Sequence, residues 1–196
     1  MKHKNIILCG VGGQGTILAS KLIAAAAMKK GLGVKTAETI GMAQRGGSVF
    51  SHVRLGAELH SPMIAPGQAD IIIAFEPAEA LRHLPFLKEG GTVVASLAPI
   101  FPVSTMIGDS SYPLEEVLQQ LKNTIKKLTL IDSEAAVREL GSPKVLNVLL
   151  LGAAVRTGEL GLELEDIEAA LHEKVPARFH ELNEKALRYT EGKKLS

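Results

Sequence analysis

The sequence predicts an α/β protein with a doubly wound, mostly parallel sheet, a β-hairpin insertion and a helical C-terminal cap. Short apolar runs alternate with helix-prone segments over residues 1–140. A glycine-rich turn at residues 10–15 separates the first apolar run from an alanine-rich segment, as in Rossmann-like folds. Residues 141–196 contain three helix-prone segments. We therefore expect one domain over residues 1–196, with an α/β core at 1–140 and a helical part at 141–196.

The first elements follow from short sequence patterns. Asn5–Cys9 is continuously apolar and ends at a glycine, which is typical of a buried parallel strand. Residues 16–30 are alanine-rich and end before a glycine, so they predict a helix, and 34–37 predicts a second strand. Residues 48–55 alternate in polarity, and we expect 58–61 to pair with them as a hairpin.

The remaining elements continue the alternation of strands and helices. Residues 70–75 form the most apolar central strand, and Pro77 is suited to the first turn of the next helix. Asp132 and Ser133 can cap a helix. The other expected elements are a helix to residue 87, strands at 92–95 and 128–131, and helices at 114–127, 143–155, 164–174 and 176–190.

Composition excludes several classes of protein. With 22 basic and 21 acidic residues, the net charge of +1 argues against a nucleic-acid-binding protein. One cysteine, Cys9, cannot form an intrachain disulfide, and it cannot hold an iron–sulfur cluster or a structural zinc without ligands from other chains. The longest apolar run, 145–155, is too short to cross a membrane, and no signal peptide is evident. We expect a cytoplasmic protein.

The glycine-rich turn is the strongest candidate binding site. Gly10, Gly12 and Gly15 fit the pattern G-x-G-x-x-G between a strand and a helix. We expect Gly10 to permit a tight turn, Gly12 to let the backbone approach a phosphate, and Gly15 to let the helix pack against the sheet. Amide groups at the start of the helix then favour an anion, and close packing without a ligand is the alternative. Further candidate binding residues are Gly13, Gln14 and Thr16, with Gln14 at the mouth of the turn.

A nicotinamide nucleotide site would need an acid at the end of the second strand. Glu38 is the only candidate, but it lies farther from Gly10 than the usual spacing of about 20 residues. We therefore favour the interpretation that Glu38 is a solvent-exposed acid in a loop and does not bind a nucleotide.

A second glycine-bearing loop contains Gln44, Arg45, Gly46 and Gly47. It follows the second predicted strand, so we expect it at the carboxyl edge of the sheet beside the first turn. An arginine with two glycines suits phosphate or carboxylate, and a flexible surface loop is the alternative.

Several polar residues have simpler interpretations. We expect Glu76 to cap a helix and Asn147 to bond to the backbone in the core. His52 and His60 could approach each other across the hairpin, but without a carboxylate they would make a poor metal site. We therefore predict no metal site and no catalytic set in this chain alone.

These motifs together resemble the gamma-type domain of the 2-oxoacid:ferredoxin oxidoreductases. The resemblance covers nearly the whole chain, and the two glycine motifs in order are more specific than either one. The matching segments are 10–15, 44–48, 53–54, 61–62, 69–76 and 90–94, with Asn147 and Gly152 in the late helix. A separate chain of this size with C-terminal helices is most similar to the small subunit of the indolepyruvate branch.

The resemblance implies a role within a larger enzyme. The implied partner is a large alpha subunit holding thiamine diphosphate and iron–sulfur clusters, with ferredoxin as the electron acceptor and coenzyme A contacting the glycine loops. Three alternatives remain open: a gamma subunit for pyruvate, 2-oxoisovalerate or 2-oxoglutarate, a free-standing NAD(P)-linked dehydrogenase, and an assembly subunit without a catalytic contribution.

Overall fold

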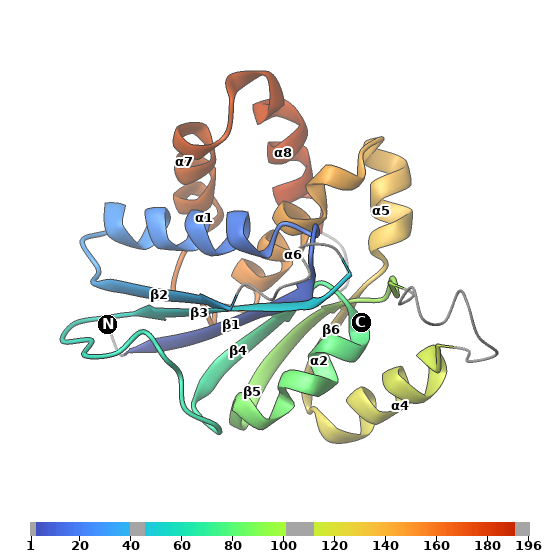
Figure 1. The fold of residues 1–196 in the computed structure, drawn as a ribbon. Coiled ribbons are helices and arrows are strands. Elements are labelled where there is room, and N and C mark those ends of the chain that lie inside the picture. Colours follow the sequence, from blue (N-terminus) through green and yellow to red (C-terminus); the bar gives the residue numbers. More distant parts are fainter. Residues whose placement is uncertain (1–2, 40–45, 101–111, 191–196) are drawn as a thin grey trace.

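The computed structural model describes residues 3–39, 46–100 and 112–190. A six-stranded sheet in the order β2-β3-β1-β4-β5-β6 lies between two layers of helices (Figure 1). The doubly wound, mostly parallel α/β prediction is thereby confirmed. The strands are β1 (Lys4–Val11), β2 (Val34–Thr39), β3 (Ser48–Leu55), β4 (Ala69–Ala74), β5 (Leu87–Ser96) and β6 (Lys127–Ile131).

The parallel part of the sheet consists of β1, β4, β5 and β6. These strands are covered on both faces, which explains their continuous apolar runs. In β1, Ile6 and Leu8 belong to the core on one side of the sheet, whereas Ile7 and Cys9 belong to the core on the other side. Because successive side chains of a strand point to opposite faces of the sheet, one apolar run contributes to the hydrophobic cores on both faces.

The expected hairpin of residues 48–55 with 58–61 is wrong. β3 pairs antiparallel with β1 on one side and with β2 on the other, and residues 56–60 form no strand. The alternating pattern of β3 required an antiparallel neighbour but did not specify which one. Arg54 instead donates from Nε to Asn5 Oδ1, 2.9 Å away, and from Nη1 to the carbonyl of Ser61.

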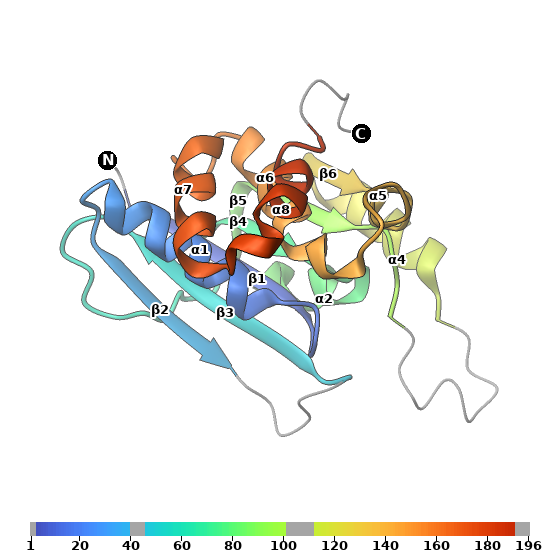
Figure 2. The same cartoon turned by 90° about the horizontal axis from the view of Figure 1, so that it is seen from above.

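Among the described residues, helices cover both faces of the sheet, with the larger layer on the side of α1 (Figures 1 and 2). The central helix, α6, is apolar on all sides and buried along nearly its whole length, so it fits between the sheet and the outer helices. The first layer holds α1 (Thr16–Lys29), α5 (Ser133–Leu140), α6 (Leu146–Arg156), α7 (Leu164–Lys174) and α8 (His180–Leu187), and the second holds α2 (Pro77–His83) and α4 (Leu114–Thr124).

Several helices are shorter than predicted. The helix expected to run to residue 87 ends at His83, because Pro85 cannot continue it, and a 3-10 turn, Leu84–Phe86, leads into β5. Similar turns, Pro143–Val145 and Ala177–Phe179, precede α6 and α8. The predicted cap of α5 is confirmed, since the Asp132 side chain accepts from the amide of Ala135.

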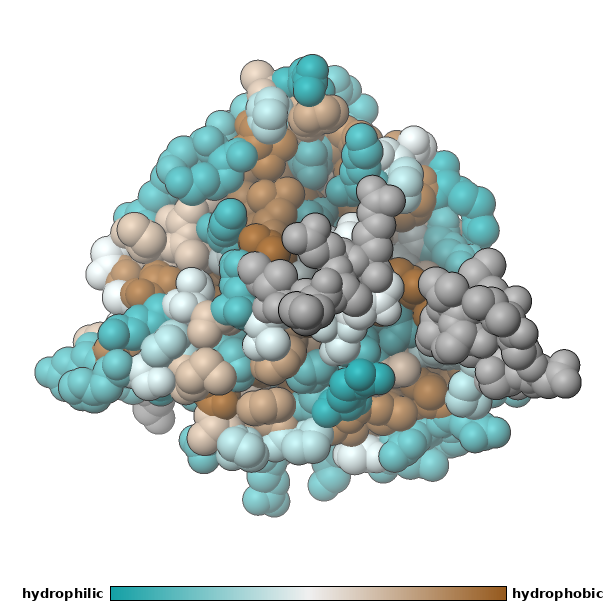
Figure 3. Space-filling model, in the orientation of Figure 1, coloured by the Kyte–Doolittle hydropathy of each residue, from teal (hydrophilic) through white to brown (hydrophobic). Residues whose placement is uncertain are grey.

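The surface is mostly hydrophilic at its margins, with smaller hydrophobic areas between them on the face that Figure 3 shows. Among the described residues, the exposed large hydrophobic side chains are Ile17, Met28 and Met63. Within the same part of the chain, every helix is too short or too polar to traverse a bilayer.

Candidate anion-binding site at the glycine turn

Gly10 lies inside β1 and does not form the tight turn that the sequence predicted for it. The strand continues to Val11, and a methyl group at Gly10 would lie 2.7 Å from Gln14 Oε1 and 2.9 Å from Phe75 Cβ. Gly10 therefore makes room for the folded-back turn and for the end of β4. The turn itself depends on Gly13, with φ 104°, and Gly15, with φ 83°.

Gly15 permits close packing against α6 rather than against the sheet. A methyl group at this position would lie 2.6 Å from Asn147 Nδ2. Asn147 is buried, and its Oδ1 accepts from the amide of Val148 at 2.9 Å, while Nδ2 lies 3.5 Å from the Gly15 carbonyl oxygen. The prediction that Asn147 bonds to the backbone in the core is confirmed.

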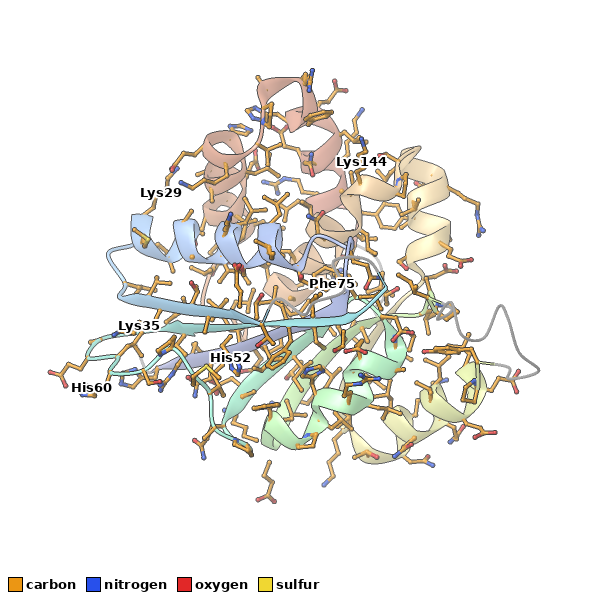
Figure 4. All side chains as sticks on the ribbon, viewed as in Figure 1. Lys29, Lys35, His52, His60, Phe75 and Lys144 are labelled. Atoms are coloured by element: carbon orange, nitrogen blue, oxygen red, sulfur yellow. The ribbon has the colours of Figure 1, made fainter. Side chains whose placement is uncertain are left out.

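Gln14 holds the turn together and does not lie free at its mouth. Its Oε1 accepts from the Val11 amide at 2.7 Å, and its Nε2 donates to the Phe75 carbonyl at 2.8 Å. Figure 4 labels Phe75 between the sheet and the helices above it. Both ends of the carboxamide are thus used within the protein, so Gln14 positions the turn.

The described end of the second glycine loop lies beside the glycine turn, as predicted. The Gly12 amide donates to the Gly47 carbonyl at 2.9 Å, and Ser48, the first residue of β3, pairs with Val11. The loops do not follow adjacent strands, however, because β3 separates β1 from β2. Gly46 adopts φ 79°. Gln44 and Arg45 lie outside the described residues, and their part in binding stays a prediction.

Several backbone amides remain available in the glycine turn and at the start of α1. Within residues 3–39, 46–100 and 112–190, no acceptor pairs with the backbone N–H groups of Gly13, Gly15 and Thr16. The first turn of α1 carries no acidic residue. Unpaired amides at a helix N-terminus, together with the helix dipole, favour an anion. Their role in binding stays a prediction.

A cavity of about 420 Å³ opens beside these amides. The glycine turn and the start of α1 form one wall, and the end of β2 and the start of β3 form the other. Glu38 belongs to β2, so the expectation that it lies in a loop is wrong, and its Oε1 lies 3.1 Å from the Ser20 hydroxyl. The cavity is lined by Gly12, Gly13, Gly15, Thr16, Ile17, Glu38, Thr39, Val49, Phe50 and Ser51.

Two buried carboxylates, Glu76 and Glu79, lie at the start of α2, in the helix layer opposite α1. The sequence patterns did not predict that they act together. Glu76 caps α2 by accepting from the Glu79 amide at 2.9 Å, which confirms its predicted role. Glu79 accepts from the Ser48 hydroxyl, and Glu76 accepts from the Tyr112 hydroxyl, both at 2.5 Å. Burial and the bond to Glu76 raise the pKa of Tyr112, so it stays a neutral donor. These hydrogen bonds connect α2 to residues 48 and 112, more than 30 positions away in the sequence, so no local sequence pattern predicts them.

Cys9 is unsuited to nucleophilic chemistry. Its side chain is fully buried, and its sulfur lies 3.5 Å from the Glu79 carbonyl oxygen. Burial, followed by the charges of Glu79 and Glu76, raises the pKa of the Cys9 thiol well above its ordinary value. The thiol is therefore protonated and inert at neutral pH.

The predicted approach of His52 to His60 is wrong, because the hairpin does not form. His52 is buried beneath the sheet, where Nδ1 accepts from the Ile64 amide at 3.2 Å, whereas His60 is exposed at the far end of a loop (Figure 4). Burial and the proximity of His83 lower the pKa of His52, so it stays neutral.

Comparison with known proteins gives the chain its family. Residues 5–191 match the family described as pyruvate ferredoxin/flavodoxin oxidoreductase. An indolepyruvate oxidoreductase subunit from Archaeoglobus fulgidus is 40% identical, over 94% of this chain and 92% of that protein.

Solved structures agree with this relationship. The gamma subunit of a keto/oxoacid ferredoxin oxidoreductase from Geobacter sulfurreducens is 26% identical, with a TM-score of 0.71 over 96% of this chain and 94% of that one. A 2-oxoglutarate:ferredoxin oxidoreductase from Magnetococcus marinus, described with 2-oxoglutarate, coenzyme A and succinyl-CoA bound, shares the fold. Its identity is 21% and its TM-score 0.69, over 96% of this chain and 30% of that longer one. The chain belongs to the pyruvate ferredoxin/flavodoxin oxidoreductase family.

Proposed function

We propose that this chain is the small subunit of an indolepyruvate:ferredoxin oxidoreductase. The observation that carries the proposal is its 40% identity, over 94% of its length, to an indolepyruvate oxidoreductase subunit. The identity to a keto/oxoacid gamma subunit is lower, at 26% over a similar length. The assembled enzyme would decarboxylate arylpyruvates, transfer the acyl group to coenzyme A, and pass the electrons to ferredoxin.

The chemistry of the chain supports a division of labour with a larger alpha subunit. One buried cysteine cannot by itself hold a cysteine-ligated iron–sulfur cluster. We therefore assign the clusters and thiamine diphosphate, which supplies the carbanion chemistry, to the partner. This chain would bind and orient an anionic co-substrate at the rim of its sheet.

The glycine turn is our proposed contact for coenzyme A. Gly13, Gly15 and Thr16 line a cavity of about 420 Å³, and their amides, which bond to no acceptor among the described residues, are suited to the oxygens of a diphosphate. The Magnetococcus marinus protein, which has the same fold, is described with coenzyme A bound. Gln44, Arg45, Gly46 and Gly47 would approach the same ligand from the second loop, with Arg45 providing a positive charge.

Reconstitution with the companion subunit tests the substrate assignment. We expect indolepyruvate and phenylpyruvate to support coenzyme A-dependent reduction of ferredoxin with a higher kcat/KM than pyruvate, 2-oxoisovalerate or 2-oxoglutarate. A preference for one of the latter three would identify a gamma subunit instead. Binding of NADH by the chain alone, seen as a change in nicotinamide fluorescence, would favour the dehydrogenase alternative.

A pair of substitutions on α1 tests the coenzyme A contact. Ile17 lines the cavity and is 37% exposed, whereas Met28 is exposed near the other end of the same helix. Ile17→Glu places a carboxylate beside the amides, so we expect a roughly tenfold rise in the apparent KM for coenzyme A, equivalent to about 1.4 kcal/mol. Met28→Glu adds the same charge outside the cavity and should leave that KM unchanged.

Arg45→Ala provides an independent arm of the same experiment. A rise in the apparent KM for coenzyme A would support the proposed charge pairing. If neither Ile17→Glu nor Arg45→Ala changes that KM, while the complex still assembles and turns over, the chain is an assembly subunit that does not contact coenzyme A.

A further inference from the structure

A group of metal-ligating side chains lies on the helical hairpin formed by α7 and α8, outside the glycine-turn site. Glu168 and His172 are four residues apart on α7, so they share one face of that helix. Glu184 faces them from α8, and His172 Nε2 lies 2.5 Å from Glu184 Oε1. One potential ligand atom from each of the three residues lies within 4.8 Å of the others.

We propose that Glu168, His172 and Glu184 form a binding site for a divalent transition-metal ion, with zinc as the fitting case. One imidazole nitrogen with two carboxylate oxygens is a ligand set for zinc, cobalt or nickel, whereas calcium and magnesium favour oxygen ligands alone. Three protein ligands would leave one tetrahedral position for water.

The spacing of the ligand atoms suits such an ion. Zinc–nitrogen and zinc–oxygen bonds of about 2.0–2.2 Å place two tetrahedral ligands about 3.3 Å apart. The three ligand atoms, none more than 4.8 Å from another, reach that spacing through small rotations of half-exposed side chains. Because all three residues lie on helices, their backbones already hold the ligands in one place.

The charge around the group also favours a cation. Arg188 Nη2 lies 3.1 Å from Glu165 Oε1 and 2.6 Å from Glu168 Oε2, and Glu184 adds a third carboxylate. Three carboxylates therefore lie at or beside the group with one guanidinium between two of them, and a divalent cation would reduce the repulsion among them. Arg188 Nη2 donates to Glu168 Oε2, and Oε1 of the same carboxylate is the atom that we assign to the metal.

A second histidine packs against the ring of the proposed histidine ligand. His180 stacks on His172 with ring centroids 4.5 Å apart and an interplanar angle of 14°. His180 Nε2 lies 2.7 Å from the Val175 carbonyl oxygen, so this nitrogen carries a proton and donates it to the carbonyl. Stacking against His180 limits rotation of the His172 ring, whose Nε2 lies 2.5 Å from Glu184 Oε1.

Calorimetric titration of the metal-free full-length chain with zinc tests the site. We expect one zinc per chain, no measurable heat with magnesium or calcium, and a raised Tm in the presence of zinc. His172→Ala and Glu184→Gln should each weaken zinc binding by about tenfold or more. His60→Ala is the matched control, because His60 is exposed and lies outside the group.

Cobalt absorption provides a second readout of the same site. A cobalt spectrum with intense visible bands in the wild-type chain, lost in His172→Ala, supports a low-coordinate site with a histidine ligand. Circular dichroism checks that each variant remains folded. The proposal is overturned if zinc binds with less than one equivalent, or if His60→Ala weakens binding as much as His172→Ala; the three side chains would then form ordinary surface ion pairs.

Discussion

Replacing Gly15 with alanine should destabilise the protein through two separable effects. The first is the left-handed backbone at φ 83°, which costs a residue with a Cβ about 1–2 kcal/mol. The second is a contact of 2.6 Å between the new methyl group and Asn147 Nδ2, which forces this buried side chain to move. Displacing Asn147 threatens its bond to the Val148 amide and adds about 1–2 kcal/mol. We expect a total loss of about 2–4 kcal/mol.

Gly13→Ala is the matched control for the backbone effect. Gly13 has φ 104°, but a methyl group there would meet nothing within 4 Å. We therefore expect about 1–2 kcal/mol for this substitution, from backbone strain alone. Urea denaturation followed by circular dichroism measures both free energies of unfolding.

A double-mutant cycle identifies the contact. Asn147→Ala removes the obstructing amide, so Gly15→Ala should cost less in that background than in the wild-type chain. Equal losses for Gly15→Ala and Gly13→Ala, or no coupling between Gly15 and Asn147, would refute the inference that this turn is packed against α6.

Three further predictions concern the core and the surface. Gly152→Ala places a methyl group 2.0 Å from a backbone oxygen of α8, so it should cost about 2–3 kcal/mol in the same urea assay. Gly158→Ala should cost only the strain of its left-handed backbone, about 1–2 kcal/mol, because its methyl group would meet nothing. Cys9, buried with a raised pKa, should react with a thiol reagent only as fast as the protein unfolds, and rapid labelling of the native chain would contradict its burial. Burial alone would raise the pKa of Glu159, but Lys4 and Lys127 hold that pKa below its usual value. The ionised carboxylate therefore stabilises the folded protein above about pH 4.3, and this stabilisation is lost as the pH falls through the folded-state pKa. Glu159→Gln should therefore cost about 0.5–1 kcal/mol at pH 7 and nothing near pH 2, and a loss independent of pH would show that the ion pairs do not contribute.

Local patterns predicted the strands and the position of the turn better than the pairing of strands. The apolar runs of β1 and β4 could be read directly, because a strand buried on both faces leaves a continuous apolar signature. The alternation of β3 was equally clear, but many antiparallel partners satisfy it, and the partners turned out to be β1 and β2. Strand register is a property of the whole sheet, which a single segment does not encode.

The candidate site shows the same limit at the level of side chains. The pattern of glycines located the turn, but it assigned the tight bend to Gly10, whereas the left-handed residues are Gly13 and Gly15. The bond from Gln14 to the Phe75 carbonyl joins residues 61 positions apart, so no local spacing could reveal it. Such contacts emerge only once the sheet brings β1 and β4 together.

The bonds that Gln14 and Gly12 make within the protein have a consequence for recognition. They join the turn to Phe75, the residue directly after β4, and to Gly47 of the second loop. The anion that we propose would therefore meet a glycine turn that these bonds already hold in place, and ordering the turn would cost little conformational entropy. Gln14→Ala removes the bond to the Phe75 carbonyl. It should leave the association rate and the rate of the chemical step unchanged and raise the dissociation rate of the ligand.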